Sequence, residues 1–173
     1  MARPVLCHRP ALPLGAPVTG AGRFAPDAAL YAADPGAALR LSGGGGLWLT
    51  VGRPAAGYVA LAFDLPAAMA ADLSSGHDLR VVLTIARMAG RPLPAAAHLR
   101  LSVEDAGEPW RMTVPLVLAE GPAEVALGPG PGLPPRLPRC RRRGWIDLVL
   151  TGAGGSALGL RDLTIRRAPA PVL

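Results

Sequence analysis

Aromatic and polar side chains of the types that bind sugars recur along the apolar segments of this chain. An indole or phenol ring can stack on the apolar face of a sugar, while nearby Asp, Arg and His side chains bind its hydroxyl groups. The candidates for such a ligand site are Trp48, Tyr58, His98, Arg100, Trp110 and Asp147, with Trp145 as a further stacking residue. The competing interpretation is that tryptophans in a small β-sandwich pack in the core or along an edge.

A short basic run forms a second candidate contact surface. It contains Arg139, Arg141, Arg142 and Arg143 around Cys140. Such a loop can attract a polyanion, an acidic membrane surface or a protein partner, although the interleaved aromatic residues of a specific nucleic-acid platform are missing. All 18 basic residues are Arg, and Lys, Asn and Gln do not occur, which is typical of a GC-rich genome and weakens the net charge of +6 as a sign of function.

Catalytic motifs are not recognisable in the sequence. No serine has the Gly-x-Ser-x-Gly context, and the glycine run at residues 43–46 lacks the Lys-Ser/Thr of a phosphate loop. Strand carboxylates could in principle hydrolyse glycosidic bonds, but pairing with nearby arginines is the simpler interpretation. Those carboxylates are Asp64, Glu104, Asp147 and Asp162. We therefore expect a protein that is not an enzyme.

Metal ligands and disulfide partners are scarce. The two cysteines, Cys7 and Cys140, are too few for a disulfide framework, and only the adjacent Cys7 and His8 lie near each other in the sequence. Convergence of these residues with His77 and His98 in space would be needed to build a site. We expect no metal site and no cofactor.

Short apolar segments separated by turn residues are the elements that must position the candidate residues. Apolar and polar side chains alternate in them, as with Leu47 and Leu49 on one face and Trp48 on the other. The predicted strands cover residues 47–51, 58–65, 79–88, 98–104, 110–118, 123–127, 145–150 and 158–167. This spacing predicts an all-β, jelly-roll-like antiparallel sandwich of about eight strands over residues 38–173.

Three local features refine this expectation. Residues 1–37 are rich in Pro, Gly and Ala without sustained periodicity, which predicts an irregular arm with at most one short edge strand. Residues 66–73 suit one helical turn, and Pro115 predicts an edge strand or bulge. The last two strands flank a small-residue turn at 152–156 and are interpreted as a closing hairpin.

The closing segments resemble those of an uncharacterised bacterial family, a domain of unknown function. Residues 145–150 have the order Trp-hydrophobic-Asp-Leu, and residues 160–165 have Leu-Arg-Asp-hydrophobic-Thr-hydrophobic, as at the end of that family's sequences. The segment 63–66, Phe-Asp-Leu-Pro, is similar to a second family pattern. The resemblance covers about residues 38–167 and implies an all-β sandwich but no activity. The closing loop lacks the family's acidic and amide residues, so any ligand contact there is not implied for this chain.

Two functions remain open at this point. The first is a non-catalytic β-sandwich module that binds carbohydrate or a similar polar ligand. The alternative is a structural or protein-interaction domain that docks a partner through strand edges and the basic run. The N-terminal region carries prolines and arginines in place of an unbroken apolar stretch, and no segment is long and apolar enough for a transmembrane helix, so we expect a cytoplasmic location.

Overall fold

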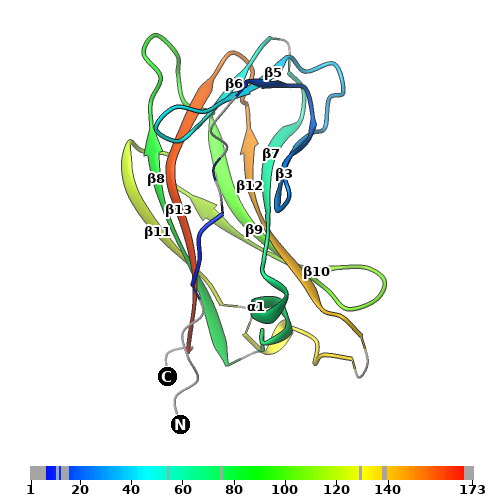
Figure 1. Cartoon of the computed structure of the whole chain (residues 1–173). Helices are drawn as coiled ribbons and strands as arrows, with labels where there is room; N and C mark the ends of the chain where they lie inside the picture. The colour runs from blue at the N-terminus through cyan, green and yellow to red at the C-terminus, as the bar shows by residue number, and fades with distance from the viewer. Residues whose placement is uncertain are drawn as a thin grey trace.

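The chain forms two antiparallel sheets that face each other (Figure 1). The structure is a computed structural model. It describes residues 7–10, 12, 16–53, 55–74, 76–128, 130–137 and 140–169. Sheet A has the order β11-β8-β13-β6-β5-β2, with β1 also paired to β13. Its strands are β1 (Cys7–His8), β2 (Val18–Thr19), β5 (Leu39–Ser42), β6 (Leu47–Val51), β8 (His77–Ala86), β11 (Gly121–Leu127) and β13 (Ala157–Pro169).

Sheet B has the order β10-β9-β12-β7-β4-β3. Its strands are β3 (Gly22–Ala25), β4 (Ala28–Ala32), β7 (Tyr58–Asp64), β9 (Ala96–Glu104), β10 (Trp110–Leu116) and β12 (Arg143–Thr151). The helix α1 (Ala67–Ala71) lies near one end of the sandwich, and a 3₁₀ turn, η1 (Gly130–Gly132), follows β11. No helix of the described part is long and apolar enough to cross a membrane.

The core fills the space between the two sheets. Inward side chains alternate with outward ones on each strand, so that Leu61 and Phe63 of β7 and Leu83 and Ile85 of β8 are each only 1% exposed. Burying one such side chain stabilises the fold by about 1.5 to 3 kcal/mol. The predicted antiparallel sandwich is therefore confirmed, as are the helical turn at α1 and the edge position of Pro115 in β10.

The N-terminal segment contributes more structure than the sequence predicts. Within the predicted irregular arm lie β1 to β4, and β4 forms a five-residue ladder with β7. Ala28 and Leu30 of β4 are buried in the core. The alanine-rich strand lacks the β-branched residues that mark strands in sequence, and its burial against β7 overrides that weak local preference.

The predicted closing hairpin is wrong. β12 pairs with β7 and β9 in sheet B, whereas β13 pairs with β8, β6 and β1 in sheet A. The turn between them carries the chain from one sheet to the other, and its backbone bonds to β6, as in the Gly155 N–H donating to the Val51 carbonyl at 2.9 Å. Both strands bury one apolar face, so placing them in opposite sheets lets the two faces pack on each other.

Candidate functional site

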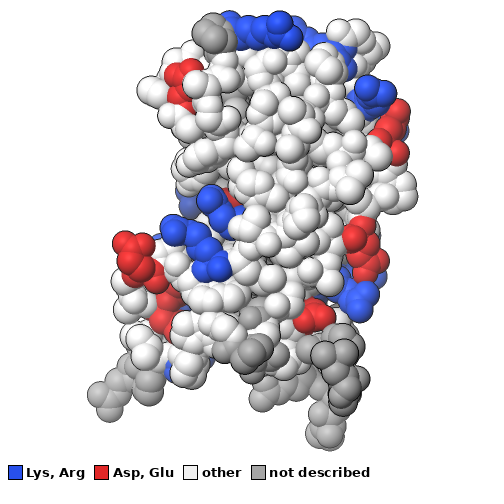
Figure 2. All heavy atoms as spheres, turned by 180° about the vertical axis from the view of Figure 1, so that it is seen from behind, with Lys and Arg blue, Asp and Glu red and all other residues white. Residues whose placement is uncertain are grey.

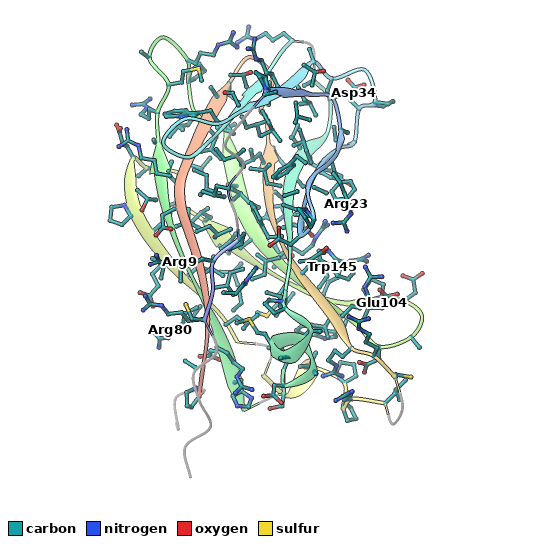
Figure 3. The ribbon with its side chains drawn as sticks, viewed as in Figure 1. Arg9, Arg23, Asp34, Arg80, Glu104 and Trp145 are labelled. Carbon is teal, nitrogen blue, oxygen red and sulfur yellow. The ribbon has the colours of Figure 1, made fainter. Side chains whose placement is uncertain are left out.

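A hollow of about 390 Å³ lies on the outer face of sheet B. It crosses β3, β4, β7, β12 and β9, and small-molecule sites of about 300 to 1,000 Å³ are usual in proteins. Its lining residues are Arg23, Ala29, Tyr31, Ala32, Tyr58, Ala60, Ala62, Asp64, Arg100, Glu104, Arg143, Trp145 and Asp147. Figure 3 shows Arg23, Trp145 and Glu104 on one side of the molecule, one below the other. We call this hollow the sheet-B groove.

Small side chains create the floor of the sheet-B groove. Ala29 pairs with Ala62 across β4 and β7, and Ala60 lies two residues further along β7 on the same face. These alanines point away from the core, yet they are only 1% to 6% exposed, because longer neighbouring side chains rise around them. The floor is therefore apolar and narrow, with a rim of larger groups.

Aromatic rings border the floor on two sides. Tyr31, the register partner of Ala60, and Tyr58 are 49% and 39% exposed, so both rings reach the solvent. Trp145, the register partner of Asp64 on β7, is half-buried on the other side. The three rings offer flat apolar surfaces around one small floor, which suits a flat ligand with one apolar face.

Two ion pairs supply the polar groups of the groove. Arg100 Nε donates to Asp147 Oδ2 at 2.8 Å, between register partners on β9 and β12. Arg23 Nη2 donates to Asp64 Oδ2 at 3.0 Å, and this pair is more exposed. The exposed Arg23–Asp64 pair keeps further N–H groups and oxygens able to bind a hydroxyl group, whereas Asp147 is also bonded by the Trp145 side chain. In Figure 2 basic side chains with acidic neighbours gather at the left of the face, others lie along its right edge and top, and the middle is largely uncharged.

Asp147 has an unusual environment for a carboxylate. Its side chain is only 3% exposed, and burial raises the pKa of Asp147 above the ordinary value of 3.8, although hydrogen bonding from Arg100 opposes the rise. The folded protein therefore holds this proton more tightly than the unfolded chain does between 3.8 and the raised pKa. At pH values above the raised pKa, the buried and ionised carboxylate lowers the free energy of unfolding. This destabilisation is lost as the pH falls towards 3.8 and the carboxylate takes up its proton.

This shift predicts the pH dependence of an Asp147→Asn variant. The amide cannot ionise, so the variant lacks the destabilisation that the ionised carboxylate causes in the wild type near neutral pH. As the pH is lowered from about 7 to about 4, we expect the free energy of unfolding of the variant to decrease relative to that of the wild type. Urea unfolding of both proteins at the two pH values measures this. A difference that is constant, or that grows on acidification, would contradict the assigned direction.

The groove brings together three of the six candidate ligand residues. Tyr58, Arg100 and Asp147 line it. His98 lies on the same face of β9, opposite Val149, but does not line the hollow. Trp48 lies on β6 of sheet A, and Trp110 lies on β10 at the edge of sheet B with its ring against the core. The sequence pattern shows neither which sheet contains a strand nor where the strand lies in it.

The two remaining tryptophans are engaged in packing. Trp48 is on the outer face of sheet A, where its Nε1–H donates to the Gly44 carbonyl at 3.1 Å. Its ring lies against Gly159 of β13, so closely that a methyl group there would come within 2.6 Å of the ring. Trp110 packs half-buried against the core beside Gly132 of η1. Neither ring is offered to a ligand in the sheet-B groove.

Several lining residues were not among the six predicted. Tyr31 and Arg23 lie in the segment interpreted as an irregular arm, so no face could be assigned to them. Trp145 was a stacking candidate, and its alternation with Ile146 and Leu148 already places it opposite the apolar stripe. Asp64 and Glu104 also alternate with core residues, but only the register shows that they meet on one face.

The basic run separates into residues with different roles. Arg142 is 3% exposed, and its guanidinium bonds to both oxygens of Asp105 at 2.7 Å each and to the carbonyls of Leu73 and Pro134. Its predicted contact with a polyanion or a partner is therefore wrong, because its donors are used inside the protein. Arg141 and Arg143 are exposed, and Arg139 lies outside the described residues.

Metal-binding residues do not gather in the described part of the chain, where no group of three or more His, Cys, Asp and Glu residues could hold an ion. The two cysteines are free, with Cys7 exposed and Cys140 half-buried.

No protein-family model matches the sequence, and no curated protein matches it. Among solved structures, the chain is similar to one described for the promiscuous specificity of carbohydrate-binding modules of the β-sandwich superfamily, with 14% identity and a TM-score of 0.45. That alignment covers 92% of this chain and 55% of that one, so this chain spans about half its length.

Two other solved structures show a comparable likeness. The family 11 carbohydrate-binding module of a cellulosomal cellulase of Clostridium thermocellum is 12% identical, with 98% and 97% of the two chains covered and a TM-score of 0.45. A cyclase from Fischerella sp. TAU is 13% identical, with 97% and 86% covered and a TM-score of 0.47. At these values the likeness assigns neither a ligand nor a reaction to this chain.

Proposed function

We propose that this chain is a non-catalytic carbohydrate-binding module that holds a sugar chain in the sheet-B groove. One observation carries the proposal. An uncharged alanine floor is bordered by the rings of Tyr31, Tyr58 and Trp145, with two Arg–Asp pairs beside them. This combination suits a sugar. Each sugar ring has an apolar face that stacks on an aromatic side chain, and its hydroxyl groups form hydrogen bonds with charged side chains.

The state of the carboxylates supports a binding role over hydrolysis. Glycoside hydrolysis uses two carboxyl groups, one as an acid and one as a base or nucleophile, on either side of the bond that breaks. In the groove, Asp147 is held by Arg100 and Asp64 by Arg23, so each carboxylate already has a guanidinium partner. A carboxylate held by a guanidinium is fixed in position, which suits the orientation of sugar hydroxyl groups beside it.

Trp145 provides a direct test of the proposal. We expect Trp145→Ala to weaken binding of a soluble oligosaccharide by about tenfold or more, since loss of a central aromatic hot spot costs about 2 kcal/mol or more. Isothermal titration of the wild type against a panel of oligosaccharides identifies the ligand, and the variant is then titrated with it.

Trp48→Ala is the matched control, because Trp48 is also half-buried but lies on sheet A. We expect it to lower the melting temperature through lost packing on Gly159 while leaving the affinity unchanged. The proposed function would be overturned if the folded wild-type protein bound no oligosaccharide of the panel. It would also be overturned if both variants lost affinity equally.

A further inference from the structure

A second hollow of about 380 Å³ adjoins the sheet-B groove. The two hollows share Asp64, Arg143 and Trp145, so a sugar chain that lies in the first hollow can continue into the second. The second hollow lies between the start of β12 and α1, where Ala67 and Ala70 leave it open. It has no aromatic ring beyond the shared Trp145.

The charges of the second hollow are not balanced. Arg142 is neutralised by Asp105, and Asp64 by Arg23. Arg141 and Arg143 are exposed, and their side chains form no hydrogen bond or ion pair with any described residue. The register partner of Arg143 is Glu104, and both residues line the first hollow, but no ion pair joins the two side chains. Two guanidinium groups that form no ion pair with a described residue therefore lie at one end of the groove.

Arginine in this setting favours an anionic group. The guanidinium fork binds carboxylate and sulfate oxygens with two parallel hydrogen bonds, and its charge adds to each bond. The shared Trp145 places this anion site directly after a surface on which a sugar ring can stack. Among glycans, those with acidic substituents therefore complement the charge of these arginines best.

We propose that the ligand is an acidic glycan, with its sugar rings in the sheet-B groove and a carboxylate or sulfate group bound by Arg143 and Arg141 in the second hollow. This inference rests on the proposed function and specifies its substrate class. Arg142 has a positioning role, because its bonds to Asp105, Leu73 and Pro134 fix the backbone between the two exposed arginines.

The test compares acidic and neutral oligosaccharides of equal length by isothermal titration at low and high NaCl. Uronic-acid chains and sulfated chains are separate arms, which distinguish the two sources of the anion. We expect the preferred acidic chain to bind about tenfold more tightly than its neutral counterpart at low salt, and Arg143→Ser to remove most of that preference. Arg166→Ser is the matched control, because Arg166 is an exposed arginine on β13 of sheet A.

The outcomes separate this inference from the proposed function. Equal binding of neutral and acidic chains, unchanged in Arg143→Ser, would overturn the anion site while the binding module stands. Acidic binding that falls equally in Arg143→Ser and Arg166→Ser reflects net charge alone and also overturns it. If a single-stranded oligonucleotide bound as tightly as the glycan, the assignment of a glycan as the ligand would be overturned. If no glycan bound, both proposals would be overturned.

Discussion

Ala62→Phe is expected to weaken oligosaccharide binding by at least about 100-fold, close to abolition, because the new ring occupies the floor on which the ligand lies. Ala62 points outward from β7 between Ala29 and Asp147, its register partners on either side. A larger side chain there fills the sheet-B groove and does not enter the core, and aromatic residues are well tolerated in strands. We therefore expect the melting temperature to change little.

Titration of Ala62→Phe with the oligosaccharide that the wild type binds measures this loss. The matched control is Thr84→Phe, which adds a ring to the outer face of β8 in sheet A. Binding by Thr84→Phe should equal that of the wild type. If Ala62→Phe stays folded and binds as well as Thr84→Phe does, the ligand does not lie on the alanine floor.

Arg142→Met is expected to lower the melting temperature by about 10 °C, because removing one partner of a buried ion pair costs about 3 to 5 kcal/mol. The side chains of Arg142 and Asp105 are 2% and 9% exposed, so the carboxylate would stay largely buried without its cation. The carbonyls of Leu73 and Pro134 would lose their donor as well. Met keeps most of the volume, so the effect reports charge and hydrogen bonds more than packing.

Arg141→Met, one residue earlier and exposed, is the control for Arg142→Met. Its melting temperature should stay within about 2 °C of the wild type, as for most surface substitutions. Thermal unfolding followed by circular dichroism compares the three proteins. A drop in Arg141→Met as large as that in Arg142→Met would show that Arg142 is no more structural than its neighbours.

Alternation along single strands was enough to predict much of the fold. Leu47 and Leu49, or Leu99 and Leu101, face inward as the period of two requires, and the residues between them face outward. This is why Tyr58, Arg100 and Asp147 could be placed on polar faces before their sheet was known. The pattern holds because each strand buries one side in a single core.

The arrangement of strands could not be predicted in the same way. Strand order depends on contacts between distant segments, so β12 and β13 were interpreted as a hairpin although they lie in opposite sheets. β4 escaped notice because its alanines carry no strand signal, and with it Tyr31 was missed. Arg142 resembled its exposed neighbours because sequence does not show that Asp105 lies across from it. Each error concerns a partner far away in the chain.

The central claim is that the ligand binds in the sheet-B groove, and the indole signals of the three tryptophans test it most directly. A ¹H–¹⁵N correlation spectrum gives one indole N–H signal for each of Trp48, Trp110 and Trp145, assigned by single substitutions. On titration with the oligosaccharide that binds, we expect the Trp145 signal to shift while the Trp48 signal on sheet A stays in place. A shift of the Trp48 signal with the Trp145 signal unmoved would place the ligand on the opposite face and contradict binding in the sheet-B groove.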